Sequence, residues 1–178
     1  MTTTIDPRYP IGKFERRDKL SAADRRELID QIAAAPQRLR DAVRGLNEQQ
    51  LDTPYRDGGW TVRQVIHHLP DSHMNAYMRT KLALTETEPL IRPYDEDAWA
   101  KLNDSRDTPI ETSMTLLEAL HGRWVALLRS LDEPHYAQTL KHPEHLRIMS
   151  IDTLIGIYAW HGRHHVAHIT SLRERMGF

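Results

Sequence analysis

Four stretches of this sequence repeat apolar residues every three or four positions, which is the spacing of amphipathic helices. They cover about residues 21–45, 61–85, 108–131 and 150–176. Each such helix must bury its apolar stripe against another element, and 178 residues are enough for a sizeable core. We therefore predict an all-α fold, a four-helix bundle with long connections, in which residues 1–178 form a single domain.

Three of these helices begin with capping signals. Ser21 is the predicted N-cap of the first helix, and Asp24 completes a capping box. Thr61 and Gln64 form the same pattern at the start of the second helix. Thr108, which a proline follows directly, is the predicted N-cap of the third helix.

Two prolines fall inside predicted helices, where proline removes a backbone hydrogen bond. We expect Pro36 to kink or break the first helix and Pro70 to kink the second. Residues 1–20 are predicted to be an extended lead-in, and residues 86–110 a long connection. Residues 132–149 are predicted to form a loop that includes a short helix or a pair of strands.

The last helix contains four of the eleven histidines within eight residues. His161, His164, His165 and His168 lie on one side of it, because residues three and four apart are neighbours. His165 falls within the apolar stripe and His161 at its edge, so this pair is best placed to bind a metal from inside a bundle. A zinc-protease motif is excluded, because Gly162 occupies the position of its glutamate.

The second helix supplies a third candidate ligand. His68 lies closer to the apolar face than its neighbour His67, so we expect His68 to point into the bundle. With His161 and His165 it would form a three-histidine set with an open position, which is typical of a catalytic metal site. Zinc and nickel both suit imidazole ligands.

Composition excludes several classes of function. The net charge of −1 gives no reason to expect a nucleic-acid or membrane partner. The absence of cysteine excludes disulfides, thiolate ligands and a cysteine nucleophile. The first residues lack the apolar core of a signal peptide, and no apolar run approaches membrane-spanning length. We therefore expect a cytoplasmic protein.

Several motifs together resemble the YfiT family within the DinB superfamily. They read TPYRDGGWTVRQ (53–64), HHLPDSHMN (67–75), IRPYD (91–95), LHGRW (120–124) and WHGRHHVAHI (160–169). The resemblance implies an up-down four-helix bundle, a homodimer, and one divalent metal ion per subunit held by His68, His161 and His165. Pro70 departs from the small residue expected at its position.

The resemblance also implies an activity. Members of the family are described as metal-dependent hydrolases that act on a small-molecule substrate. Related bundles are S-transferases that use a low-molecular-weight thiol such as bacillithiol, and that alternative stays open. A non-catalytic metal-binding bundle is the second alternative. Candidates to orient groups around the metal are Asp71, Ser72, Asn75, His121 and His168.

Structural roles are expected for the remaining histidines. We predict that His67, His73 and His164 are solvated, and that His121 is a hydrogen-bonded residue at the edge of the core. No aspartate or glutamate is placed by the sequence as an evident general base.

Overall fold

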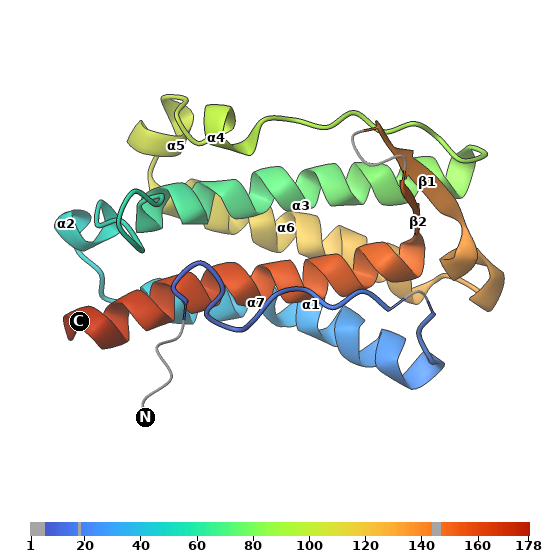
Figure 1. The fold of residues 1–178 in the computed structure, drawn as a ribbon, viewed down its shortest axis with the longest axis horizontal. Coiled ribbons are helices and arrows are strands. Elements are labelled where there is room, and N and C mark those ends of the chain that lie inside the picture. Colours follow the sequence, from blue (N-terminus) through green and yellow to red (C-terminus); the bar gives the residue numbers. More distant parts are fainter. Residues whose placement is uncertain (1–5, 18, 144–146) are drawn as a thin grey trace.

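A computed structural model describes residues 6–17, 19–143 and 147–178. Four long helices dominate it: α1 (Ala22–Val43), α3 (Val62–Thr85), α6 (Ile110–Arg129) and α7 (Ile151–Met176) (Figure 1). The predicted all-α four-helix bundle with long connections is therefore confirmed. Among the residues described, no helix is both long and apolar enough to cross a lipid bilayer.

The four helices are not arranged in the order of the chain. Helix α1 packs against α6 and α7, and α3 packs against the same two helices from the other side. Helices α3 and α6 run in the same direction, because His67 contacts Ser113 near their starts and Thr80 contacts Trp124 further along both. In chain order, α1, α3, α6 and α7 thus run up, down, down and up (Figure 1). The resemblance implies a strictly alternating up-down bundle, and the structure differs from it in this respect.

This direction of α6 follows from the long connection before it. The connection holds the short helices α4 (Glu96–Trp99) and α5 (Asp104–Asp107) and runs back along α3 to the end where α3 began (Figure 1). The side chain of Gln64 donates a 2.7 Å hydrogen bond to the carbonyl of Ala100 and ties the connection down. Helix α6 consequently starts beside the start of α3.

The other connections are compact. Helix α2 (Glu48–Leu51) joins α1 to α3. Between α6 and α7 lie the 3₁₀ helix η1 (Glu133–Ala137) and the strands β1 (Thr139–His142) and β2 (Arg147–Ser150), which pair antiparallel. The predicted short helix or strand pair is confirmed, and both are present.

Most predicted helix ends are confirmed. The Ser21 and Thr61 capping boxes are both formed. Helix α6 begins one residue later than predicted, with Pro109 at the N-cap position and no side-chain cap. Pro36 and Pro70 lie inside α1 and α3, and both helices continue through them.

The buried apolar residues form two clusters along the bundle. One contains Ile32, Ala76, Trp124 and Tyr158, and the other contains Leu39, Ile66, Leu117 and Ile169, among others. Each of the four long helices therefore contributes to both clusters. Along α3, α6 and α7, His73, His121 and His161 fall between residues of the two clusters. These imidazoles contact one another and, with His68 and His165, form a histidine layer across the interior of the bundle.

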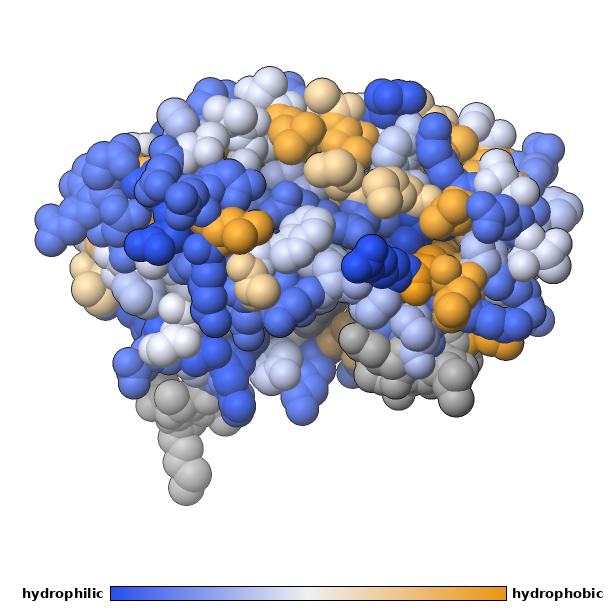
Figure 2. Space-filling model, turned by 90° about the horizontal axis from the view of Figure 1, so that it is seen from above, coloured by the Kyte–Doolittle hydropathy of each residue, from blue (hydrophilic) through white to orange (hydrophobic). Residues whose placement is uncertain are grey.

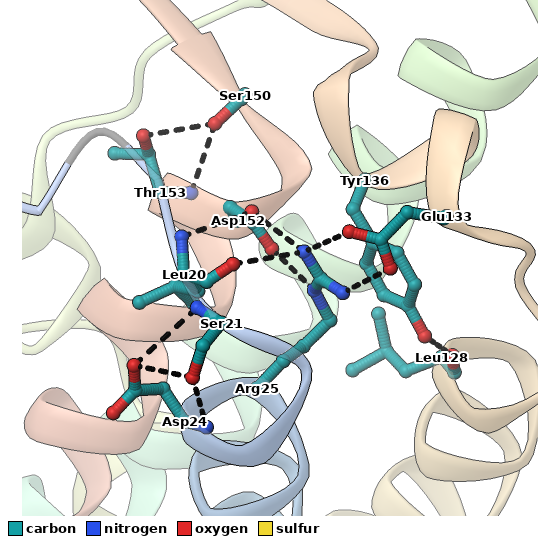
Figure 3. A network of polar contacts seen from close by, with 10 residues as sticks. All are labelled: Leu20, Ser21, Asp24, Arg25, Leu128, Glu133, Tyr136, Ser150, Asp152 and Thr153. Atoms are coloured by element: carbon teal, nitrogen blue, oxygen red, sulfur yellow. Dashed lines mark hydrogen bonds and ion pairs between the residues drawn. The ribbon is translucent and has the colours of Figure 1, made fainter.

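At one end of the bundle a buried arginine connects three elements (Figure 3). The guanidinium of Arg25 in α1 donates to both carboxylate oxygens of Asp152 in α7, at 2.7 and 3.0 Å, and to Glu133 in η1 at 2.8 Å. It also lies 3.9 Å from the ring centroid of Tyr136. Because the charge is paired and hydrogen-bonded, it is tolerated inside the protein.

Candidate metal centre

Three imidazoles from α3 and α7 converge in the histidine layer. The ligand atoms of His68, His161 and His165 all lie within 4.8 Å of one another. Burial lowers the pKa of His68 to about 4 and holds the pKa values of His161 and His165 well below the ordinary value. All three are therefore neutral at pH 7, which is the protonation state that binds metals.

One spacing in this cluster matches that expected around a small divalent ion. With zinc–nitrogen bonds of about 2.0–2.1 Å, two nitrogens of a tetrahedral site lie about 3.3–3.4 Å apart. The Nε2 atoms of His68 and His161 are 3.3 Å apart. Among the residues that the structure describes, no fourth histidine or carboxylate joins this cluster. The arrangement can accept an ion with one position left for another ligand.

Trp60 holds the cluster from the side of the α3 N-terminus. Its ring lies 4.7 Å from that of His68 and 6.3 Å from that of His165, measured between centroids. The Trp60 indole N–H donates a 2.9 Å hydrogen bond to Asp97 in α4. The connection before α6 is therefore linked to the imidazole cluster through one tryptophan.

A cavity of about 370 Å³ adjoins the cluster at His165. Its polar and aromatic lining includes Arg8, Tyr55, Arg56, Trp60, Asp97, His164, His165 and His168. These residues come from the N-terminal segment, from the loop that precedes α3, from helix α4 and from helix α7. The cavity can hold a small molecule next to one of the candidate ligands.

Asp97 is a feature that the sequence analysis did not identify. It supplies a carboxylate in the same cavity as His165, whereas the sequence placed no aspartate or glutamate as an evident general base. In the sequence Asp97 lies in the long connection, 29 residues after His68, and no periodic pattern relates the two. Its place depends on how the connection folds back along α3.

The five residues predicted to orient groups around the metal have different surroundings. His168 lines the cavity and stacks on Tyr55, with 4.0 Å between ring centroids. Ser72 is buried beside the hydroxyl of Tyr158. His121 is buried and hydrogen-bonded, as predicted, to the carbonyl of Ile32.

Asp71 and Asn75 are linked by a hydrogen bond one turn apart in α3. The side-chain amide of Asn75 donates to the backbone carbonyl of Asp71 at 2.9 Å. Burial raises the pKa of the Asp71 carboxyl to about 6, and the nearby Asp104 in α5 adds to the rise. Within the described part of the chain, no hydrogen bond connects either side chain to the three imidazoles.

Three histidines predicted to be solvated are buried, so that prediction was wrong. The exposed fractions of His67, His73 and His164 are 4%, 0% and 7%. His67 bonds to Ser113 of α6, and His164 stacks on Trp160. At His67 the outward side of α3 is covered by α6, and at His164 the outward side of α7 is covered by the N-terminal segment. Neither contact could be predicted from the periodicity of a single helix.

His73 could have been found from its spacing. It lies seven residues after Ile66 and three before Ala76, both of which face the core. In the structure its Nε2 is 3.1 Å from Nδ1 of His161, and its Nδ1 is 2.8 Å from Nε2 of His121. It therefore contacts a candidate ligand directly.

Comparisons with known proteins agree with this structure. A family model described as the DinB superfamily matches residues 31–169. A protein of Bacillus subtilis (strain 168) named "Putative metal-dependent hydrolase YfiT" is 48% identical over 176 residues, which are 99% of both chains. A relative from Oceanobacillus iheyensis with the same kind of name is 55% identical, over 96% of this chain and 98% of that one.

A solved structure of YfiT from Bacillus subtilis shares the fold. It matches with a TM-score of 0.95 and 49% sequence identity, over 97% of this chain and 98% of that chain. It is described as having "an unusual four-helix bundle topology". The resemblance to the YfiT family that the motifs indicated is thereby confirmed.

Proposed function

This chain belongs to the DinB superfamily, and from that premise we propose that it is a metal-dependent hydrolase with a small-molecule substrate. The observation that supports this most strongly is the convergence of three neutral imidazoles beside a cavity. We propose that His68, His161 and His165 hold one divalent ion per chain. Zinc or nickel would suit this donor set.

The metal would have a catalytic and not only a structural role in this proposal. A structural zinc site is usually closed by four protein ligands, whereas a catalytic site keeps one position free. The cluster of described donors has three members and adjoins a cavity, which favours the catalytic role. When bound, a divalent ion supplies a Lewis acid that polarises a substrate oxygen and favours attack by water at neutral pH.

Asp97 is the proposed general base. Its carboxylate lines the cavity and accepts a hydrogen bond from the indole N–H of Trp60, which supports a role in accepting a proton from the attacking water. The guanidinium of Arg56 lies in the same cavity, where it bonds to the Tyr55 hydroxyl and the Asp57 carbonyl. We propose that Arg56 attracts an anionic group of the substrate.

Assembly and compartment are part of the same proposal. We propose a homodimer and a cytoplasmic location, and we treat residues 1–178 as one domain. Figure 2, which views the molecule from above the orientation of Figure 1, shows hydrophobic patches between hydrophilic residues on this face. Met74 and Met78 are exposed on α3 and offer apolar surface for a second copy.

Turnover measurements test the proposed reaction. Protein loaded with zinc or nickel is assayed against panels of esters and amides, and in parallel with bacillithiol plus an electrophile. We expect hydrolysis that depends on the metal. Turnover with the thiol and none with water would replace the hydrolase by an S-transferase, and no turnover of any kind would favour a non-catalytic metal-binding bundle.

A matched pair of variants tests Asp97. The substitution Asp97→Asn should retain metal and lower kcat by about 10²–10⁴-fold, the usual contribution of a general base. Asp107→Asn removes an exposed carboxylate from α5, outside the cavity, and should leave kcat unchanged. Equal activity of Asp97→Asn and the unaltered protein would remove Asp97 from the mechanism.

A further inference from the structure

A row of hydrogen-bonded histidines leads from a backbone carbonyl to a candidate metal ligand. The carbonyl oxygen of Ile32 in α1 is 2.7 Å from Nδ1 of His121. His121 Nε2 is 2.8 Å from His73 Nδ1, and His73 Nε2 is 3.1 Å from His161 Nδ1. His161 Nε2 then faces His68 at 3.3 Å. The row crosses the bundle from α1 through α6 and α3 to α7.

A proline explains why this carbonyl can accept a bond from a side chain. In a regular α-helix the carbonyl of Ile32 would accept the N–H of the residue four positions later. That residue is Pro36, which has no N–H to donate. The Ile32 oxygen is thereby left for His121, and a buried carbonyl without a partner would be destabilising.

The direction of every hydrogen bond in the row follows from its first member. A carbonyl oxygen only accepts, so His121 must have its proton on Nδ1. A neutral imidazole has one donor and one acceptor nitrogen, so His121 Nε2 accepts and His73 Nδ1 donates. By the same reasoning His73 Nε2 accepts, and His161 Nδ1 donates to it. The remaining nitrogen, His161 Nε2, then holds a lone pair.

The opposite set of tautomers conflicts with the first contact. It would place the lone pair of His121 Nδ1 against the Ile32 oxygen at 2.7 Å and leave that buried carbonyl without a donor. Burial also lowers the pKa of His121, the first histidine of the row, to about 4. Neutral imidazoles are therefore the relevant form.

We propose that the Ile32 carbonyl, acting through His121 and His73, fixes the tautomer of His161, so that its Nε2 lone pair faces His68 ready to bind a metal. Ligating histidines usually donate their second N–H to a carboxylate, a carbonyl or a water. Here His73 accepts the second N–H of His161, and His121 connects His73 to the Ile32 carbonyl on the other side of the bundle. His73 and His121 are thus positioning residues, and their effect on metal affinity rests on the proposed function.

Nuclear magnetic resonance of the metal-free protein tests the tautomers directly. Long-range ¹H–¹⁵N spectra of histidine-labelled protein show which ring nitrogen is protonated. We expect protons on Nδ1 of His121, His73 and His161. A proton on Nε2 of His73 or of His161 would overturn the proposal. This result does not depend on whether the protein binds metal or turns over a substrate, so the failure of either proposal can be recognised separately.

Paired substitutions then test the link to the metal. His121→Phe keeps the ring shape and removes both nitrogens, so His73 and His161 should lose their uniform tautomer and zinc should bind 10–100-fold more weakly, as is usual for such outer partners. His121→Gln again offers a donor and an acceptor group, so the uniform tautomer of His73 and His161 and the zinc affinity should both be as in the unaltered protein. The control His67→Phe removes a buried histidine of α3 that bonds to Ser113 outside the row, and should change neither.

The outcomes of this comparison are distinct. Unchanged tautomers of His73 and His161 in His121→Phe would overturn the proposal, and so would a loss of zinc affinity as large in His67→Phe as in His121→Phe. If His121→Phe does not fold, the tautomers of the unaltered protein and of His121→Gln still decide the matter.

Discussion

Burial keeps the imidazoles inside this bundle uncharged. The pKa of His121 falls from an ordinary value of 6.5 to about 4 because the ring is removed from water. Its hydrogen bond to Ile32 opposes this shift and is the weaker influence. Desolvation thus sets the protonation state of residues that a metal site and its surroundings need neutral.

This burial predicts how stability depends on pH. Between pH 6.5 and 4 the unfolded chain takes up a proton at His121 and the folded protein does not, so stability falls as the pH falls. The loss is about 1.4 kcal/mol per pH unit for each such histidine, and stability is independent of this group above pH 6.5. Urea unfolding of the metal-free protein at several pH values measures the slope.

The matched variant for this experiment is His121→Gln. It removes one titrating group from the core, so its stability should depend less steeply on pH than that of the unaltered protein. Identical slopes for the two proteins would contradict the assignment of a low pKa to His121.

At the scale of single residues, the sequence predicted part of the candidate site. His161 and His165 were chosen because residues four apart share a face of a helix, and His68 because of its place beside an apolar stripe. The structure brings these three together. Asp97 was missed because its place depends on the folding of a long connection. His73 was missed although its spacing from Ile66 and Ala76 in α3 indicates a buried position.

At the scale of single elements, sequence patterns located the helices well. The capping boxes at Ser21 and Thr61 predict helix starts because they satisfy backbone N–H groups locally. The prolines were harder to interpret. Pro36 does not break α1, since packing against α6 and α7 holds the helix together. In addition, His121 forms a hydrogen bond with the Ile32 carbonyl, which lacks a backbone donor because of the proline.

The buried ion pair of α1 and α7 supports a prediction about stability. Arg25→Met should lower the free energy of unfolding by about 3–5 kcal/mol, because it leaves the Asp152 carboxylate without its main partner. Glu133→Gln should cost less than about 1 kcal/mol, because the Glu133 side chain is 72% exposed. Thermal or chemical unfolding followed by circular dichroism measures both.

An exposed arginine at the C-cap of α1 provides the control. Arg44 pairs with Asp41 on the surface, and Arg44→Met should change stability by less than about 0.5 kcal/mol. A loss for Arg25→Met no greater than for Arg44→Met would show that the network in Figure 3 does not stabilise the bundle.

At the scale of the whole molecule, the sequence predicted the bundle but not the order of its helices. Helical periodicity shows that each helix has one buried face, but it does not show which other helix covers that face. The connection of residues 86–109 decides this, because it returns along α3 before α6 begins (Figure 1). As a result α3 and α6 are parallel, and His73 meets His121.

The proposed assembly is also tested at this scale. Light scattering coupled to size-exclusion chromatography should give twice the mass of the 20.7 kDa chain. Replacing Met78 by glutamate should shift the population towards monomer if exposed α3 forms the contact. A monomer at all concentrations would contradict the homodimer.

The central claim is that His68, His161 and His165 together bind one divalent ion. Isothermal titration of metal-free protein with zinc and with nickel, checked by elemental analysis of dialysed samples, measures it most directly. The account predicts one ion per chain for the unaltered protein and for His67→Ala, and loss of stoichiometric binding in His68→Ala and His161→Ala. One tightly bound ion per chain in either of the last two variants would contradict it.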